Sequence, residues 1–372
     1  MNIKIIVWIL ILIYYINSHS REYDKNSISR LVRFSIILLI IESGLRHISV
    51  GPDTTGYYGS FYSVMKMDWS SVLAGLFVDK TEFRDPGYNI VVKLFATIIP
   101  SWQIFILACA VLYYYSLGRL MSKYCNSCTS VFLGFTLILA LFDIIALSGM
   151  RQMITMAISM LAIESIMDKK LLRSVFLVAI GSLIHISCIF VLLFIPFVYM
   201  REKLQHTIHL FSLFVFPLIG IFSRRIVGFL AGFSANDYYM GYAEKENSVV
   251  GYTFAAVVFL TSLFIFFRND SIYLRASDDD VKAKFLKPAA VLMTLSAPLI
   301  LQDGSMIRIC QYFSIYLVIT IGNIVDNSRN RRAEYLIMFF FLLFYIFTSQ
   351  ADYHFFWQTV SGYTYTHPFW GF

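Results

Sequence analysis

Long apolar runs follow one another along almost the whole chain, and few charged residues separate them. Charged residues make up 14% of the sequence and hydrophobic residues 58%, whereas a soluble globular protein has about 25% charged residues. Because a soluble surface cannot be covered by so few charges, the composition indicates a membrane protein. The runs lie at about 3–16, 34–50, 88–100, 102–118, 131–149, 152–167, 174–184, 186–200, 207–223, 249–267, 286–301, 308–325 and 334–350.

The number and length of these runs predict an all-α, polytopic helical integral membrane protein. One helical span needs about 20 apolar residues, so we expect about 10–12 transmembrane helices joined mostly by short connections. No internal repeat, low-complexity linker or soluble domain interrupts the pattern, and residues 1–372 are therefore predicted to form a single membrane domain. The first run has no small-residue cleavage site after it, which favours an uncleaved anchor.

Lysine and arginine cluster in four polar segments, and such clusters mark the cytoplasmic side of a membrane protein. The four segments are 17–33, 168–173, 268–287 and 326–333. All four can be cytoplasmic only if an even number of crossings separates each segment from the next. The stretch 174–200 must then turn back near His185. By the same argument, one of 88–100 and 102–118 must fail to span.

This topology places nearly every unusual polar residue on the outer face, which for a bacterial inner membrane is the periplasm. The face is formed by one sizeable early loop at about 46–87, turns at 149–152, His185 and 302–308, the loop 224–248 and the tail at about 351–372. We therefore expect the functional site on the periplasmic side.

Two polar residues stand near the start of the early outer loop. Arg46 closes an apolar run at the membrane boundary, where a guanidinium can bind a lipid-linked phosphate bidentately. A side chain in that place can equally extend to the lipid headgroups without a specific ligand. Asp53 could orient a sugar hydroxyl or act as a base, or it could simply be the turn residue of Gly-Pro-Asp.

Aromatic and acidic residues continue along the same loop. Tyr57 and Tyr88 could each pack a ring against the C–H face of a sugar, although aromatic residues also collect at membrane interfaces in general. Asp85 opens an Asp-Pro-Gly sequence, and a substrate contact there competes with ordinary turn chemistry. For Asp85 the pattern favours the turn.

Arg151, Gln152 and His185 interrupt otherwise apolar stretches. A charge beside or within the bilayer is costly and usually faces a polar cavity, so Arg151 and its neighbour Gln152 favour a functional site over a plain surface turn. A histidine has an unperturbed pKa of about 6.5 and can accept a proton from a sugar hydroxyl. Its predicted position on the face of Arg151 makes catalysis by His185 as reasonable as a buried structural role.

A third group lies late in the chain at Asp303, Arg308 and Tyr312. Arg308 and Tyr312 are i, i+4 neighbours on a predicted helix, and they could share one phosphate site. The alternative is an ion pair between Asp303 and Arg308 that stabilises the turn.

The sequence offers no support for a metal or an organic cofactor. Cys125 and Cys128 form a lone CxxC, and the acidic run 278–280 is followed at once by lysines, which favours a solvated loop. No Walker A, dinucleotide-binding or HExxH zinc motif is present. The net charge of +7 is explained by membrane orientation, so we expect no nucleic-acid partner.

Taken in chain order, these motifs resemble the EpsG-like family, a branch of the Wzy-type polysaccharide polymerases of the bacterial inner membrane. The matching residues are Arg46, Val50-Gly51-Pro52-Asp53-Thr54, Tyr57, Asp85-Pro86-Gly87-Tyr88, Arg151-Gln152, His185-Ile186-Ser187, Arg308 and Tyr312. The tail 365–369 resembles the family's closing segment, altered by His367 and Phe369. The family commonly has Glu-Pro-Gly at 85–87. The resemblance runs from about residue 30 to 370.

The resemblance implies glycosyl transfer between two lipid-linked oligosaccharides, with undecaprenyl diphosphate leaving the donor chain. Cationic groups aimed at a leaving diphosphate lower the barrier without a metal. We expect Arg46, Arg151 and Arg308 to bind the diphosphate, and His185 or Asp53 to take the proton of the acceptor hydroxyl. The expected substrate-binding residues are Tyr57, Asp85, Tyr88, Gln152, Asp303 and Tyr312.

On this interpretation the chain is an O-antigen polymerase of lipopolysaccharide biosynthesis, with a capsule or exopolysaccharide polymerase as the alternative. A lipid-linked oligosaccharide flippase would share the spans, but it favours internal repeats and polar residues at mid-bilayer, which we do not find. A ligase of the same chemistry places its large periplasmic loop late in the chain. The expected partners are undecaprenyl-diphosphate-linked oligosaccharides, the lipid bilayer and a chain-length regulator.

Overall fold

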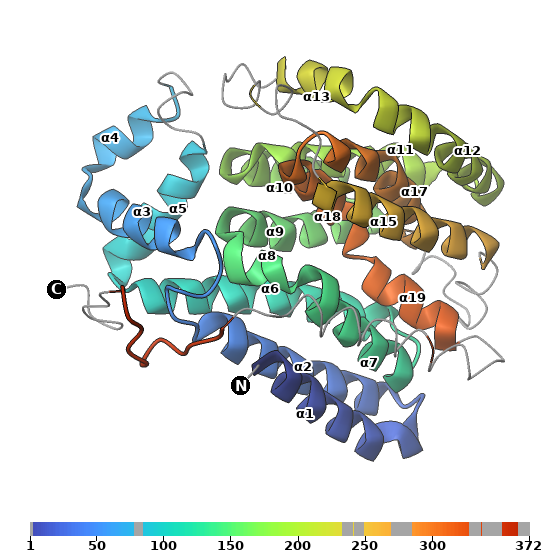
Figure 1. Ribbon diagram of the computed structural model, residues 1–372, viewed down its shortest axis with the longest axis horizontal. Coiled ribbons are helices and arrows are strands. Elements are labelled where there is room, and N and C mark those ends of the chain that lie inside the picture. Colours follow the sequence, from blue (N-terminus) through green and yellow to red (C-terminus); the bar gives the residue numbers. More distant parts are fainter. Residues whose placement is uncertain are drawn as a thin grey trace.

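The computed structural model describes residues 3–77, 85–232, 241, 249–268, 285–326, 336 and 352–363. Within these ranges all regular structure is helical, and a single isolated bridge pairs Arg46 with Phe355. The all-α prediction is therefore confirmed for the described part of the chain (Figure 1).

The first half of the chain forms short and long helices that alternate with tight turns. They are α1 (Ile3–Ser18), η1 (His19–Arg21), α2 (Lys25–Gly44), α3 (Thr54–Lys66), α4 (Trp69–Ala74), α5 (Pro86–Ile98), α6 (Trp102–Tyr124), α7 (Cys128–Leu137), the π-helix η2 (Ile138–Phe142), α8 (Asp143–Ser148) and α9 (Met150–Met167). Polar caps fix several starts: Asp24 accepts from the backbone of Ser27, and Ser101 from that of Ile104. Such caps satisfy backbone groups that the first turn leaves open.

The second half continues the bundle. Its described elements are α10 (Leu171–Ile184), η3 (Ile186–Leu193), α11 (Phe194–Tyr199), α12 (Glu202–Ile221), α13 (Ser223–Gly232), α15 (Val249–Phe267), α17 (Leu286–Ser296), η4 (Ala297–Leu301), η5 (Gly304–Met306), α18 (Ile307–Ser314) and α19 (Leu317–Asp326). The expected run at 334–350 and the acidic run at 278–280 lie outside the described residues.

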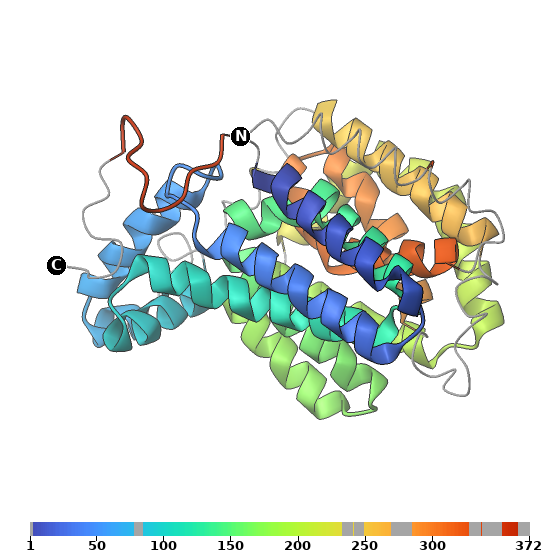
Figure 2. The ribbon, with the colours of Figure 1, turned by 90° about the horizontal axis from the view of Figure 1, so that it is seen from below.

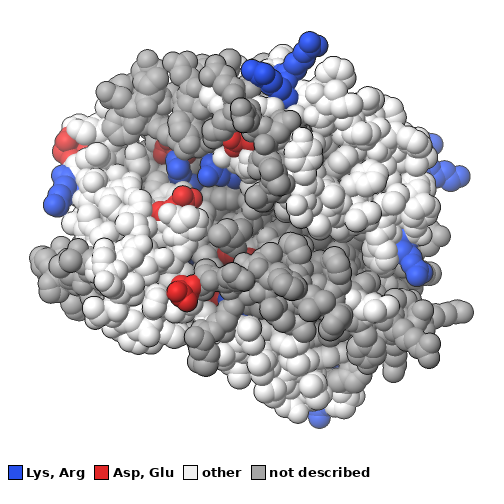
Figure 3. All heavy atoms as spheres, in the orientation of Figure 1, with Lys and Arg blue, Asp and Glu red and all other residues white. Residues whose placement is uncertain are grey.

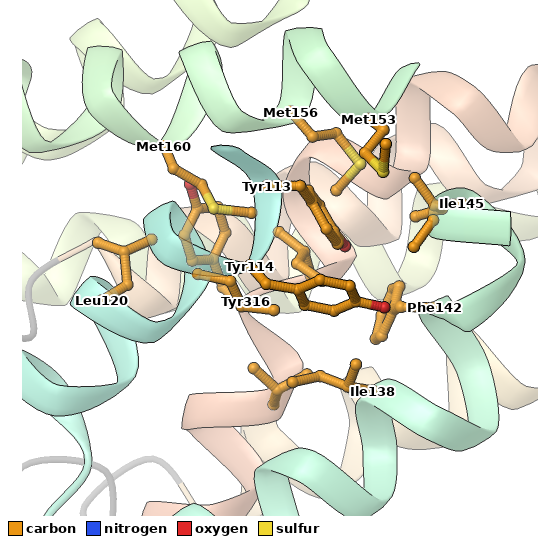
Figure 4. Close-up of a cluster of buried hydrophobic side chains, with 14 of the residues drawn as sticks. Tyr113, Tyr114, Leu120, Ile138, Phe142, Ile145, Met153, Met156, Met160 and Tyr316 are labelled. Atoms are coloured by element: carbon orange, nitrogen blue, oxygen red, sulfur yellow. The ribbon is translucent and has the colours of Figure 1, made fainter. Parts of the chain in front are cut away.

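The long helices run roughly side by side, with α9 in the middle of the bundle (Figures 1 and 2). Helix α9 packs against α6 on one side and α10 on the other, α2 packs against α6, and α7 against α19. Their interface holds a core of aromatic and methionine side chains that includes Tyr113, Tyr114, Tyr316 and Met156 (Figure 4).

Two described helices, α6 and α12, are long and apolar enough to cross a membrane, and a third span results if the bent pair of η5–α18 and α19 counts as one. Six further described helices are apolar but shorter. The helical membrane architecture agrees with the prediction, whereas the expected 10–12 spans stay a prediction. Much of the described surface in Figure 3 is uncharged, with charged side chains in small separate groups.

The predicted turn near His185 is confirmed. Helix α10 ends at Ile184, His185 is extended, and η3 packs back against α10. Because α9 runs from Met150 to Met167 and α10 runs back, Arg151 and His185 lie at the same end of the bundle.

The early segment at 46–87 is not an open loop, because its described part contains α3 and α4. Asp68 caps α4 by accepting from the backbone of Ser71. Thr54 donates to the carbonyl of Leu147, 2.9 Å away, and so anchors the start of α3 on α8. Gly51 has a φ of +89° and faces the Leu147 carbonyl so closely that no Cβ fits there. Residues 78–84 of this segment lie outside the described residues.

Candidate functional site

Asp85 lies at the centre of the polar groups that meet at this end of the bundle. It stands immediately before α5, and it is 6% exposed. One carboxylate oxygen accepts a charge-assisted hydrogen bond from Nη1 of Arg151. The other lies 3.8 Å from Nδ1 of His185. Three segments distant in sequence thus converge on one buried carboxylate.

The Asp-Pro-Gly sequence explains how α5 reaches this place. Pro86 occupies the first turn of α5, where its fixed φ suits a helix start. Gly87 lies against the backbone of Leu183, and a Cβ at Gly87 would meet that carbonyl carbon at 2.6 Å. The glycine therefore permits the close approach of α5 to the end of α10, and this approach brings Asp85 to His185.

Arg151 lies in the first turn of α9, directly after the break at Gly149. Its Nε donates to the hydroxyl of Tyr57, 3.2 Å away, and its guanidinium carbon is 5.6 Å from the centre of the same ring. The ring of Tyr57 meets that of Tyr88 edge to face at 5.6 Å. Tyr57 is half-buried and Tyr88 is buried, so Tyr57 is the more accessible of the two rings.

Arg308 is a second cation at this end of the bundle. The amide of Gln152 donates to the backbone carbonyl of Arg308 at 2.9 Å, which ties α18 to the start of α9. The side chain of Arg308 is half-buried and makes no hydrogen bond or ion pair within the described residues. His185 interacts electrostatically with both Arg308 and Arg151.

Tyr312 forms a buried polar layer with two residues that the sequence did not single out as site residues. Its hydroxyl lies 2.8 Å from Oγ1 of Thr155, and Ser187 donates to it at 3.4 Å. Thr155 follows Arg151 by one helical turn, a spacing that could have identified it. Ser187 stands two residues after His185.

Arg46 is fully buried, at 0% exposure, and its guanidinium points into the protein. Its Nη1 donates to the carbonyl of Ser43 at 2.5 Å, and its Nη2 to the sulfur of Met150 at 3.3 Å. The segment 352–356 covers it, since the amide of Phe356 donates to the Leu45 carbonyl. An arginine guanidinium stays protonated in proteins, so this buried side chain is charged at neutral pH.

Asp53 and Asp303 occupy two further helix starts. Asp53 is exposed before α3, and its carboxylate makes no hydrogen bond or ion pair in the described part of the chain. Asp303 is buried and caps η5 by accepting from the backbone of Ser305 at 2.6 Å. Neither is joined to Arg151 by a hydrogen bond or an ion pair among the described residues.

The structure thus brings some of the predicted site residues into one contact set and leaves others apart. We call Tyr57, Asp85, Tyr88, Arg151 and His185 the central cluster. A second group consists of Gln152, Arg308 and Tyr312. Hydrogen bonds connect it to the helices of the central cluster: Gln152 bonds the carbonyl of Arg308, and Thr155 and Ser187 bond the hydroxyl of Tyr312. Arg46 lies behind the start of α9, while Asp53 and Asp303 cap or precede neighbouring helices.

No metal-binding group of three or more His, Cys, Asp or Glu side chains occurs in the residues that the structure describes. All five cysteines are buried and free. The central cluster can instead supply Arg151 for an anion, an imidazole held beside a carboxylate, and an accessible tyrosine ring, and Arg308 of the second group adds another cation at the same end of the bundle. This is a set of groups suited to anion binding and proton transfer.

Comparison with known protein families places this constellation in context. The model of the EpsG family matches residues 29–365, nearly the whole chain and all residues of the central cluster. Neither the comparison with curated proteins nor that with solved structures gave a match. The extent of the family match shows that the chain belongs to the EpsG family.

Proposed function

We propose that the protein is a membrane glycosyltransferase that polymerises lipid-linked oligosaccharide repeat units. Membership of the EpsG family supports a polysaccharide-polymerase-like function. The central cluster carries the proposal, because the ion pair of Arg151 with Asp85 beside His185 joins an anion-binding group to a candidate base.

The proposed step transfers the growing chain from undecaprenyl diphosphate to a second lipid-linked repeat unit. A hydroxyl oxygen of the acceptor forms a bond to the anomeric carbon of the donor sugar. The bond between that carbon and the diphosphate oxygen breaks, and the diphosphate leaves with the electron pair. The hydroxyl proton passes to the base, so that atoms and charge balance without a redox partner.

Arg151 and Arg308 are the proposed binding groups for the leaving diphosphate. Negative charge grows on the diphosphate as the glycosidic bond breaks, and fixed cations stabilise it most strongly in the transition state. Arg308 is suited to this role because its side chain has no hydrogen bond or ion pair in the described residues. Arg46 is buried against Met150, so we place it behind Arg151, where it contributes positive potential and holds the start of α9.

His185 is the proposed base for the acceptor hydroxyl, and Asp85 is its positioning residue. A carboxylate beside one ring nitrogen orients an imidazole and stabilises the imidazolium that forms on proton uptake. Asp53 stays the competing candidate, since its carboxylate is exposed at the start of α3.

Tyr57 is the proposed platform for a sugar ring, with Tyr88 supporting it from behind. Three side chains hold the α18 side of the site in place. Gln152 donates to the carbonyl of Arg308, and Tyr312 is hydrogen-bonded to the hydroxyl of Thr155. Asp303 caps the start of η5. In this proposal their effect on substrate binding is indirect.

We infer that the active face lies on the periplasmic side of a bacterial inner membrane and that the product is O-antigen. Capsule or secreted exopolysaccharide is the alternative product of the same chemistry. The basic segments of the sequence support this orientation through the positive-inside rule. A chain-length regulator is a further proposed partner.

Deletion of the gene followed by gel analysis of the surface glycan tests the proposal. An O-antigen polymerase predicts that a long ladder collapses to lipid A–core carrying a single repeat. If the ladder were unchanged but capsule or exopolysaccharide were lost, the product would be capsule or exopolysaccharide and not O-antigen. If single repeats accumulated without reaching the outer surface, the protein would be a flippase and not a polymerase.

A further inference from the structure

A second set of buried polar groups lies between α2, α6 and α8, apart from the central cluster. Glu42 is 1% exposed and Asp143 is 2% exposed, and Tyr113 and Tyr114 are as deeply buried. Both carboxylate oxygens of Glu42, Oδ1 of Asp143 and the hydroxyls of Tyr113 and Tyr114 have no hydrogen-bond partner in the described part of the chain, whereas Oδ2 of Asp143 is ion-paired with Lys4. We call these four residues the interior acid site.

The residues of the interior acid site interact with one another electrostatically. Figure 4 shows the rings of Tyr113 and Tyr114 with their hydroxyls directed toward the segment that carries Phe142 and Ile145. Asp143 belongs to that segment and follows directly on the π-helix η2. Asp143 interacts electrostatically with both tyrosines, and Glu42 interacts with Asp143 and Tyr114.

The charged and titratable neighbours of the site come from three other elements. Lys4 of α1 forms an ion pair with Asp143. Arg46 follows the end of α2, and its guanidinium is bonded to Ser43 and Met150. Tyr353 donates to the backbone carbonyl of Glu42 at 2.5 Å, so its hydroxyl does not satisfy the Glu42 carboxyl. Asp143 thus has a cationic partner, and the Glu42 carboxyl has neither a donor nor an ion pair in the described residues.

An ionised carboxyl with no donor is among the most costly groups to bury, and it normally takes up a proton instead. Buried polar atoms that lack protein partners are commonly bridged by ordered water. We propose that the interior acid site is a hydrated proton-binding site, in which Glu42 holds a proton and water bridges it to Asp143, Tyr113 and Tyr114. The ligands are therefore water and one exchangeable proton, bound inside the helix bundle.

This site adjoins the proposed glycosyltransferase site without sharing its residues. Arg46 lies between the two, since it interacts electrostatically with Asp143 and donates to Met150, the neighbour of Arg151. A proton on Glu42 leaves the surroundings of Arg46 more positive than an ionised Glu42 would. The inference does not depend on which reaction the central cluster performs.

Infrared spectroscopy of the purified full-length protein in detergent tests for the proton directly. A protonated carboxyl gives a carbonyl stretch that shifts in D2O, and we expect this band at neutral pH. It should disappear in Glu42→Gln and persist in Asp68→Asn, because Asp68 is an exposed helix cap whose pKa is lowered by hydrogen bonds from Ser70 and Ser71. Absence of the band in the unaltered protein, or its survival in Glu42→Gln, would overturn the proposal.

Thermal unfolding of two neutralising variants gives an independent readout. Glu42→Gln replaces a neutral acid by a neutral amide, so we expect its melting temperature to stay close to that of the unaltered protein. Asp143→Asn removes the carboxylate that is ion-paired with the half-buried Lys4, and we expect clear destabilisation because this ion pair is lost. The opposite order, with Glu42→Gln the more damaging change, would show that Glu42 is ionised and would reject the proton.

Discussion

The carboxylate of Asp85 joins Arg151 to His185, although 66 residues separate Asp85 from Arg151 along the chain. In this arrangement one carboxylate neutralises the arginine and also lies beside the imidazole. A diphosphate that binds Arg151 competes with Asp85 for the guanidinium. Asp85 then remains available to stabilise the imidazolium of His185 as it takes up the acceptor proton.

Arg151→Ala is expected to remove most polymerisation. The loss of one preorganised group that stabilises developing charge costs about 10²–10³-fold in rate, and the variant also leaves Asp85 without its cation. The measurement is chain elongation in membranes that carry the variant, with the amount of membrane-inserted protein checked by immunoblot. Arg151→Lys keeps the charge but not the planar fork, and it should restore only part of the activity. Full-length polymer at normal yield from Arg151→Ala would refute the assignment.

His185→Gln is expected to reduce the rate of glycosyl transfer by about 10²–10⁴-fold, the usual contribution of a general base. The change should appear in kcat more than in KM, because the proton moves during the chemical step. The unaltered enzyme should lose activity on the acid side, since a protonated imidazole cannot accept the proton, and this acid limb should vanish in the variant. Asp53→Asn, tested in parallel, should keep the acid limb. Loss of the limb in Asp53→Asn instead would make Asp53 the base.

Gly87→Ala is expected to damage the site through packing alone. Its Cβ would lie 2.6 Å from the backbone of Leu183, so α5 and α10 must move apart, at a cost of about 1–3 kcal/mol. The matched control is Gly59→Ala in α3, where a Cβ meets nothing within 4 Å. The control should leave the melting temperature unchanged or raise it slightly. Equal melting temperatures and activities for the two variants would contradict this account of the Asp-Pro-Gly sequence.

Sequence patterns located the residues with the strongest local signal. Arg151 stands out because apolar runs flank it on both sides, and the turn at His185 followed from the parity of the basic segments. The first argument uses only the neighbours of Arg151 along the chain, and the second uses the order of basic and apolar segments; neither needs to know how the helices pack. In the structure His185 directly follows the end of α10, as the predicted turn requires, and Arg151 lies in the first turn of α9, while its functional role stays a prediction.

The sequence could not show which partners these residues have. Asp-Pro-Gly at 85–87 has the local pattern of a turn, and its contacts with Arg151 and His185 depend on how α5, α9 and α10 pack. Arg46 at the end of an apolar run has the pattern of a side chain that reaches the headgroups. Its burial depends on the distant segment 352–356, which covers it.

Arg46 and Arg308 provide the sharpest contrast between a buried cation and an accessible one. Arg308→Gln is expected to leave the melting temperature nearly unchanged, because the side chain makes no hydrogen bond or ion pair in the described residues, but to lower polymerisation at least tenfold. Arg46→Gln removes the hydrogen bonds to Ser43 and Met150 from a fully buried position. We expect it to lower the free energy of unfolding by about 2 kcal/mol.

Parallel measurement of melting temperature and elongation for the two variants separates the roles of these arginines. Arg308 binds diphosphate directly only if its variant loses activity at unchanged stability. Arg46 acts from behind Arg151 only if stability and activity fall together, because the start of α9 then shifts as Met150 loses its contact. If Arg46→Gln lost activity at normal stability, Arg46 would instead be a residue that binds the diphosphate directly. That result would require the segment 352–356 to move away when substrate binds.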